Sequence, residues 1–339
     1  MRFETIFVEE QVRYNPYSQK ILQAFPNVPV RYIRKVEDVF GRVKKPYLHK
    51  RTGLNIFVGR KEGHLVKEAP DAYGLANEPH YYFIHAYNCI YECEYCYLQG
   101  YFNSPDLVFF VNHDEIVSEM HQTCAEHPEA KRIWFHAGEF SDSLALSHVT
   151  AEWDVYWEFL RSQPRAKIEL RTKSVNIKAL LDLPALDNVT ISFSLSPDDA
   201  TRKYDRKTPS FSARLKALHR IAKHGYRIGI HFDPIVDSPN LAAEYQDLLS
   251  NLLITVKPDQ IEYISLGVVR FTKDVYSQFK RNYPNSDMQA AEFVSSFDNK
   301  VRYSRPHRLS LLNRIKQMCI EAGLHDEQVY LCMENETLS

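Results

Sequence analysis

Six short apolar segments with strand-like character recur through the middle of the chain. Each is rich in β-branched or aromatic residues and is bounded by turn residues, a pattern typical of buried β-strands. They cover residues 80–87 (HYYFIHAY), 132–136 (RIWFH), 166–172 (AKIELRT), 188–195 (NVTISFSL), 226–233 (YRIGIHFD) and 260–267 (QIEYISLG).

Helical periodicity fills the intervals between these strands. Segment 112–127 opens with Asn112 followed three residues later by Glu115, which is the spacing of a capping box. Segment 212–225 has apolar residues on one helical face and stops at Gly225, a residue favoured just beyond a helix end. The face consists of Leu215, Leu218, Ile221 and Ala222.

Strands that alternate with helices predict a parallel sheet with right-handed crossovers. Six units are fewer than the eight of a closed barrel, so we expect an α/β fold with a partial (β/α)6 TIM-type barrel; a doubly wound sheet is the alternative. Either fold places a site at the carboxyl ends of the strands. We divide the chain into an N-terminal extension packed on the barrel (1–75), the barrel (76–275), and a C-terminal hairpin, helix and closing strand (276–339).

Composition is consistent with a folded protein that has a large core. The 339 residues are 44% hydrophobic and 13% aromatic, and no run approaches the ~18 apolar residues of a membrane helix. The N-terminus, MRFETIFVEE, lacks the pattern of a signal peptide. We therefore expect a cytoplasmic protein without a membrane partner. Three of the six cysteines are bunched together, which is not the pattern of a disulfide scaffold.

Charge is unevenly distributed although the net charge is only -1. Eleven Lys or Arg stand against three acids between Arg31 and Lys67, and eight against four between Arg270 and Arg308. Two basic segments on a neutral protein favour a nucleic-acid partner, with ordinary solvated surface as the alternative.

The bunched cysteines lie in YNCIYECEYCYLQGYF, at Cys89, Cys93 and Cys96. Structural zinc sites use four ligands, usually in two separated pairs, and the chain has no second pair. A 4Fe-4S cluster bound by three thiolates keeps one iron open for another ligand, which suits this spacing. A zinc knuckle that also uses His85 remains the alternative.

The spacing Cys-x3-Cys-x2-Cys with a following aromatic resembles the signature of the radical S-adenosylmethionine superfamily. Within that superfamily, the chain resembles the spore photoproduct lyase family from about Pro79 to Met333. The matching pieces are CEYCYLQGY, GEFSDSLAL, LRTKS, SFSLSP, HFDPIV, ISLGVVRFTK, VRYSRP and VYLCME.

This resemblance implies a lyase with a 4Fe-4S cluster and S-adenosylmethionine as cofactors. It further implies repair of a thymine dimer or related lesion in ultraviolet-damaged DNA through a 5′-deoxyadenosyl radical. A one-electron donor such as flavodoxin or ferredoxin would supply electrons to the cluster. By the same resemblance, Cys89, Cys93 and Cys96 are the cluster ligands and Tyr97 relays a hydrogen atom. The cofactor-binding residues it implies are Tyr95, Gly138, Glu139, Ser141, Lys173 and Ser194.

The sequence departs from the family at the cysteine that returns a hydrogen atom to the product. Glu139 occupies that place, and a carboxylic acid cannot supply a hydrogen atom as a thiol can. Gly138 and Glu139 instead resemble the Gly-Gly-Glu element of the wider superfamily, in which the glutamate holds the cofactor's amino group. Cys332, in the expected closing strand, is our candidate for the donor.

The family also inserts a hairpin into DNA near its C-terminal end. NKVRYSRPHR matches it here and predicts DNA contacts by Lys300, Arg302, Tyr303 and Arg305. Two alternatives remain open from the residues. One is the same cluster chemistry on RNA, a nucleoside or a peptide, and the other is a non-catalytic, zinc-stabilised nucleic-acid-binding protein.

Overall fold

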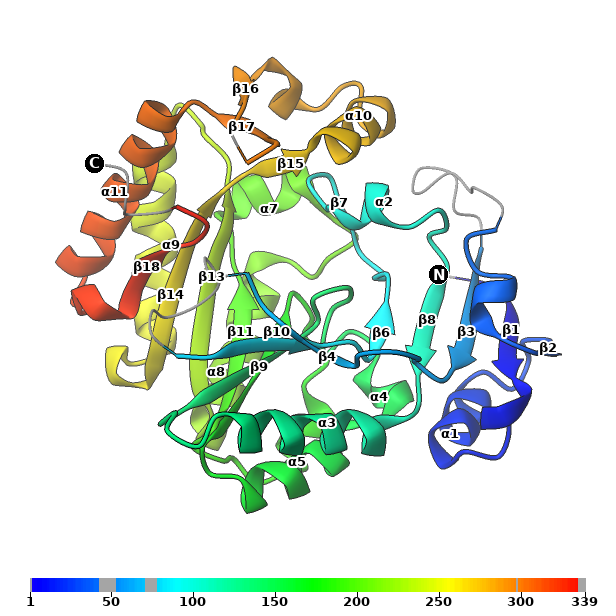
Figure 1. Cartoon of the computed structure of the whole chain (residues 1–339). Coiled ribbons are helices and arrows are strands. Elements are labelled where there is room, and N and C mark those ends of the chain that lie inside the picture. Colours follow the sequence, from blue (N-terminus) through cyan, green and yellow to red (C-terminus); the bar gives the residue numbers. More distant parts are fainter. Residues whose placement is uncertain (1, 43–52, 71–77, 297, 335–339) are drawn as a thin grey trace.

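The computed structural model describes residues 2–42, 53–70, 78–296 and 298–334. Its largest sheet has eight strands in the order β18-β14-β13-β11-β10-β9-β5-β4 (Figure 1). Five of the six predicted strands and the first part of the one predicted at 80–87 belong to it. They form β5 (His80–Phe83), β9 (Ile133–Ala137), β10 (Ala166–Thr172), β11 (Val189–Ser194), β13 (Arg227–Ile235) and β14 (Ile261–Val268). The sheet is completed at its two edges by β18 (Val329–Leu331) and β4 (Val66–Glu68).

Neighbouring strands of this sheet run parallel except for β4, which runs antiparallel to β5. The sheet curls into a half-barrel with helices on its outer side (Figure 1), so the predicted partial barrel is confirmed over the doubly wound alternative. The principal helices are α3 (His113–Glu126), α5 (Trp153–Ser162), α8 (Phe211–His224), α9 (Leu241–Thr255) and α11 (Arg305–Glu321).

A buried polar network crosses the inner face of the half-barrel. Glu169 on β10 is fully buried, and its carboxylate accepts hydrogen bonds from Ser192 (2.6 Å) and Tyr263 (2.5 Å) and lies 2.7 Å from His231 Nε2. Burial opposes ionisation of Glu169, but Arg171 and the neighbouring histidines outweigh it and hold its pKa well below the usual value. The network ties together four neighbouring strands, β10, β11, β13 and β14.

Two sequence signals at helix ends have different outcomes. The end of α8 at Gly225 is confirmed, with a φ of +108° that glycine adopts readily. The capping box at Asn112 is wrong. The Asn112 side chain accepts from the Lys61 amide (2.9 Å) and Glu115 pairs with Arg60 (2.8 Å), so both tie α3 to an earlier loop.

A second sheet formed largely by the N-terminal segment was not predicted. Its order is β2-β1-β3-β8-β6, and α1 (Pro16–Ala24) connects β1 to β2. The predicted strand 80–87 divides between the two sheets, because β5 joins the half-barrel and β6 joins this second sheet. The strands are β1 (Phe3–Glu9), β2 (Val30–Ile33), β3 (Leu54–Gly59), β8 (Leu107–Phe110) and β6 (Ala86–Tyr87).

The predicted C-terminal hairpin and closing strand are confirmed. β16 (Phe293–Ser295) and β17 (Lys300–Tyr303) form a small sheet with β15 (Arg270–Thr272), and α10 (Lys273–Asn282) lies beside it at the top of Figure 1. Within the described part of the chain, we find no helix with the length and apolar character needed to cross a bilayer.

Candidate active site

The cysteine loop begins at a sharp turn after β6. Asn88 has a φ of +62°, and its amide group donates to the carbonyls of Ser104 (2.8 Å) and Asp106 (2.7 Å). A short strand, β7 (Glu92–Cys93), then pairs antiparallel with β12 (Asp205–Arg206). The loop is therefore held at its start and at its centre by segments distant in the sequence.

The three predicted ligands lie together in this loop. Cys93 is buried, Cys89 and Cys96 are half-buried, and all three pack in one cluster with Tyr91 and Ala145. Burial raises the pKa of Cys89 and Cys93, and the neighbouring thiols add to the effect. Within the described residues, no three His, Cys, Asp or Glu side chains are grouped so as to hold a single metal ion.

A fully buried ion pair supports the centre of the loop. In β12, Asp205 lies opposite Cys93 and accepts from Arg214 Nη1 at 2.8 Å. Arg214 is fully buried and also donates to the carbonyl of Ser194 at 3.0 Å. This pair connects β12, α8 and the end of β11 directly behind the cysteines.

Two predicted cofactor residues meet at the same carboxylate. The Tyr95 hydroxyl donates to Asp205, and Lys173 donates to the Tyr95 hydroxyl at 2.8 Å while lying 3.5 Å from Asp205. Burial opposes ionisation of Asp205, but Lys173 and Arg214 outweigh it and lower its pKa. Tyr95, Lys173 and Ser194, which are far apart in sequence, are thus brought together around one ion pair.

The loop after β9 presents the other predicted cofactor residues. Gly138 has a φ of +84°, and a Cβ there would lie 2.6 Å from Ser143 Oγ, so this position requires glycine. The Ser141 amide donates to the Gly138 carbonyl at 3.2 Å. Asp142 accepts from the Lys173 amide at 2.7 Å and from two amides of its own turn. These contacts fix the loops after β9 and β10 against each other.

Glu139 lies half-buried in an aromatic environment. Together with burial, its charge raises the pKa of Tyr82. The adjacent Phe140 ring packs 4.9 Å from Tyr101 and 6.0 Å from Tyr82. The ring centroid of Tyr97, the predicted relay, lies 6.2 Å from that of Tyr101 in the same group of rings. Glu139 and Tyr97 therefore belong to one wall of rings that joins β5 and β9 to the cysteine loop.

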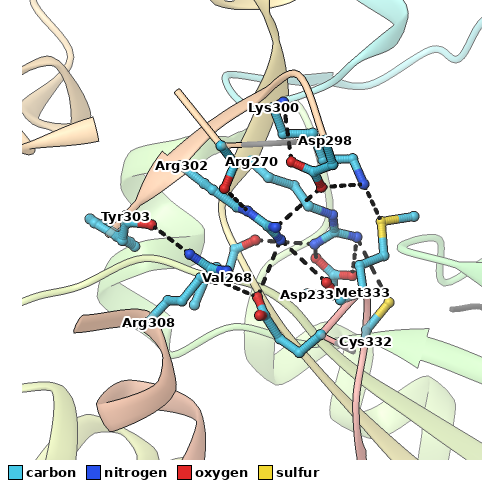
Figure 2. A network of polar contacts seen from close by, with 12 residues as sticks. Asp233, Val268, Arg270, Asp298, Lys300, Arg302, Tyr303, Arg308, Cys332 and Met333 are labelled. Atoms are coloured by element: carbon cyan, nitrogen blue, oxygen red, sulfur yellow. Dashed lines mark hydrogen bonds and ion pairs between the residues drawn. The ribbon is translucent and has the colours of Figure 1, made fainter. Parts of the chain in front are cut away.

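Cys332 lies at the carboxyl end of the closing strand. Its amide donates to the Leu266 carbonyl at 2.7 Å, and Arg270 Nη2 lies 3.9 Å from its sulfur. Arg270 is itself held by Asp233 through two hydrogen bonds of 2.8 Å (Figure 2). The thiol is half-buried, and burial raises its pKa. It occupies the edge of the half-barrel opposite β5, the strand that precedes the cysteine loop.

The predicted DNA-binding residues lie together on β17 and at the start of α11, but two of them point inward. Arg302 is 2% exposed and donates to Glu334 at 3.2 Å. It also donates to Asp298 at 3.1 Å (Figure 2). Tyr303 is buried, and its hydroxyl accepts from a backbone amide. Arg305 is exposed. Arg302 and Tyr303 would have to leave these partners to contact DNA as predicted, because acidic side chains already compensate the charge of Arg302.

A family model described as spore photoproduct lyase matches residues 75–307. The chain belongs to the spore photoproduct lyase family. It is 26% identical to the spore photoproduct lyase of a Geobacillus species and 27% identical to that of Bacillus subtilis, each over 211 residues. These alignments cover 61% of the chain and 61% of each relative. The family resemblance inferred from the cysteine motif is confirmed.

Solved structures of lyases from this family share the fold. A mutant spore photoproduct lyase with bound AdoMet and dinucleoside spore photoproduct superposes with a TM-score of 0.82 at 19% identity, covering 98% of this chain and 99% of that one. A second mutant, with the dinucleoside spore photoproduct, gives 0.82 at 20% identity. The half-barrel, the N-terminal sheet and the C-terminal hairpin thus recur as one architecture.

Sequence reasoning missed Asp205 and Arg214. Nothing local to Asp205 indicates that it lies against Cys93, which is more than 100 positions away. Arg214 did carry a signal, because it precedes Leu218 by four residues and Ile221 by seven. A charged residue on the apolar face of a helix must find a buried partner, and Asp205 is that partner.

Proposed function

We propose that the chain is a radical S-adenosylmethionine lyase that acts on a thymine dimer or related lesion in ultraviolet-damaged DNA. The observation that carries the proposal is a set of three clustered thiols at the mouth of a half-barrel, in a chain of the lyase family. The other three cysteines lie elsewhere: Cys124 and Cys319 are in the core, and Cys332 directly follows β18. Three thiols suit a 4Fe-4S cluster with one open iron.

Cys89, Cys93 and Cys96 would hold that cluster. When bound, the cluster and S-adenosylmethionine supply an electron and the means to abstract a hydrogen atom from the substrate. A one-electron donor such as flavodoxin or ferredoxin would reduce the cluster. The Asp205–Arg214 pair keeps the loop in place while the surrounding side chains bind and orient the cofactor.

The proposed cofactor contacts divide by charge. Lys173, held by Tyr95 and Asp205, provides a cation for the carboxylate of S-adenosylmethionine. Glu139, at the end of β9, provides a carboxylate for its ammonium group. Ser141 follows β9 and Ser194 ends β11, and both provide hydroxyl groups. Gly138 lets the backbone turn toward the cofactor.

Cys332 is our candidate for the hydrogen donor, because Glu139 replaces the family's cysteine. A thiol can supply a hydrogen atom, and Arg270 holds this thiol at the open end of the half-barrel. Tyr97 lies beside the cysteine loop, where a relay to the cofactor would be needed. The lesion must leave the duplex to reach these groups, and the hairpin with Lys300 and Arg305 is the proposed DNA contact.

The test is anaerobic reconstitution followed by incubation with S-adenosylmethionine, dithionite and a panel of ultraviolet-damaged oligonucleotides, with products identified by mass spectrometry. We expect repair of a thymine lesion by wild type. We expect neither iron retention nor repair after Cys89→Ala, Cys93→Ala and Cys96→Ala combined. Iron retention equal to wild type in the triple variant would contradict the cluster assignment. Cofactor cleavage without repair of any lesion would favour RNA, a nucleoside or a peptide as substrate.

A second measurement separates the cofactor contacts from the chemistry. Glu139→Gln should weaken S-adenosylmethionine binding by about 1.5–3 kcal/mol, the scale of a hydrogen bond to a charged group. Calorimetric titration of the reconstituted variant checks this. Unchanged affinity would exclude Glu139 as the ammonium partner.

A further inference from the structure

A small cavity lies behind Cys89, between the start of the cysteine loop and the turn after β9. Three polar side-chain atoms of its wall residues have no hydrogen-bond partner among the described residues. They are His85 Nε2, Asn88 Oδ1 and Ser143 Oγ. These residues are only 6%, 1% and 1% exposed, so bulk solvent does not satisfy them.

Neighbouring contacts fix what each atom can do. Both hydrogens of the Asn88 amide group are used by the carbonyls of Ser104 and Asp106, which leaves Oδ1 as an acceptor. His85 Nδ1 lies 3.4 Å from a buried Glu152 oxygen. Nε2 is therefore the ring nitrogen left without a partner among the described residues, and an imidazole nitrogen can donate or accept according to its tautomer.

The remaining group and the carboxylate complete the pattern. Ser143 can donate through its hydroxyl. Burial opposes ionisation of Glu152, but its contacts with His85 outweigh it and lower its pKa. The wall thus presents an acceptor at Asn88, a donor at Ser143 and an imidazole nitrogen of His85 that can take either role.

We propose that this cavity binds an ordered water molecule and that this water tunes the redox potential of the cluster at Cys89. A water can donate to Asn88, accept from Ser143 and take the complementary role toward His85 Nε2, which matches the wall group by group. Buried waters characteristically make about three hydrogen bonds to polar groups that are otherwise unsatisfied, and they are costly to remove. No other small ligand is needed to satisfy the wall.

The redox role rests on the proposed function, whereas the water site does not. The potential of an iron–sulfur cluster depends on hydrogen bonds near its sulfurs and on its access to solvent. Reduction adds one negative charge, and the dipole of an adjacent water changes the free energy of that charge. Losing the water should therefore shift the potential.

Two variants remove one partner of the water each and spare the fold. Ser143→Ala deletes the donor. His85→Asn keeps an N–H where Nδ1 contacts Glu152 but removes Nε2. Ser18→Ala is the matched control, because the Ser18 hydroxyl is also buried without a partner among the described residues and lies on α1, outside the cavity wall.

The first readout is a high-resolution structure of the full chain, in which we expect a water within hydrogen-bond distance of all three atoms. A dry cavity would overturn the site. The second is an anaerobic potentiometric titration of the reconstituted cluster, followed by electron paramagnetic resonance without S-adenosylmethionine. We expect a shift of the same sign in Ser143→Ala and in His85→Asn, with less than the sum of the two shifts in the double variant, because both act on one water. Ser18→Ala should match wild type.

Potentials equal to wild type in both variants would overturn the tuning role. A chain that retains no iron would instead contradict the proposed function, and the crystallographic readout would still test the water. The two failures are therefore distinguishable.

Discussion

Two buried clusters of arginines and carboxylates support the two regions of this molecule that our proposals place at the substrate. Behind the cysteine loop, Arg214 is fully buried and bonds Asp205 at 2.8 Å. Beneath the hairpin, Arg302 and Arg308 are 2% and 3% exposed and share Glu334. The first cluster joins segments from the interior of the chain, whereas the second is closed by a residue close to the C-terminus.

The difference indicates how firmly each region is held. Asp205 lies in a strand paired with the cysteine loop, so the loop cannot move without breaking a charge pair that has no access to water. In the hairpin, Arg302 also has Asp298 as a partner, so losing Glu334 still leaves one acid in place. We infer a rigid cysteine loop, as a cluster requires, and a hairpin that can be released at lower cost, as insertion into DNA requires.

The largest expected effect follows from breaking the first cluster. Asp205→Asn should reduce the free energy of unfolding by about 3–5 kcal/mol, because it leaves a buried guanidinium without its counter-charge. Urea unfolding at pH 7 measures this loss. Because the pKa of Asp205 is lowered in the folded state, its contribution is present above the usual carboxyl pKa and is lost on acidification. The gap between variant and wild type should therefore narrow as the pH falls below about 4.

Asp198→Asn on α7 (Asp198–Tyr204) is the control for this variant. Asp198 pairs with Arg202 four residues later on an exposed helix face, and such pairs contribute only about 0.3–0.5 kcal/mol. Equal effects of the two substitutions would mean that the Asp205–Arg214 pair does not hold the loop.

A smaller effect is expected from the second cluster. Glu334→Gln should cost about 1.5–3 kcal/mol, the scale of a hydrogen bond to a charged group. Asp298 continues to compensate Arg302, and Arg308 keeps the Tyr303 carbonyl and the new amide oxygen as acceptors. The same urea measurement tests it, and limited proteolysis should show earlier cleavage within 293–303 than in wild type. A loss as large as that of Asp205→Asn would remove the contrast between the regions.

The sequence predicted the regular part of this fold better than the clusters that hold it. The six barrel strands were readable because each is a short apolar run flanked by turns, and the cysteine motif located the loop. The N-terminal sheet was missed although FETIFVE and LNIFVG are comparable runs, because α1 is the one α-helix among its described N-terminal strands and no regular alternation of strands and helices results.

Contacts between distant segments could not be predicted from the sequence, for a physical reason. The Asp205–Arg214 pair depends on β12 reaching β7, and one of the two carboxylates that hold Arg302, that of Glu334, comes from 32 residues further along the chain. Neither meeting leaves a local pattern. The basic residues Lys44, Lys45, Lys50 and Arg51, which contributed to the expected nucleic-acid footprint, lie outside the described residues.

The smallest expected effect is on the salt dependence of DNA binding. It distinguishes the exposed Arg305 from the buried Arg302. If DNA binding neutralises phosphates, each lost contact lowers the log–log salt slope by about 0.9 on duplex DNA. Arg305→Ala should produce that decrease without changing the unfolding midpoint, because Arg305 is exposed at the start of α11. Lys216→Ala, on the exposed face of α8 outside the barrel, is the control and should leave the slope unchanged.

Arg302→Ala should lower stability and leave the slope as in wild type if Arg302 stays paired with Asp298 and Glu334. If Arg302→Ala reduced the slope as much as Arg305→Ala, the hairpin would have to open on DNA. Arg302 would then leave Asp298 and Glu334 and contact a phosphate.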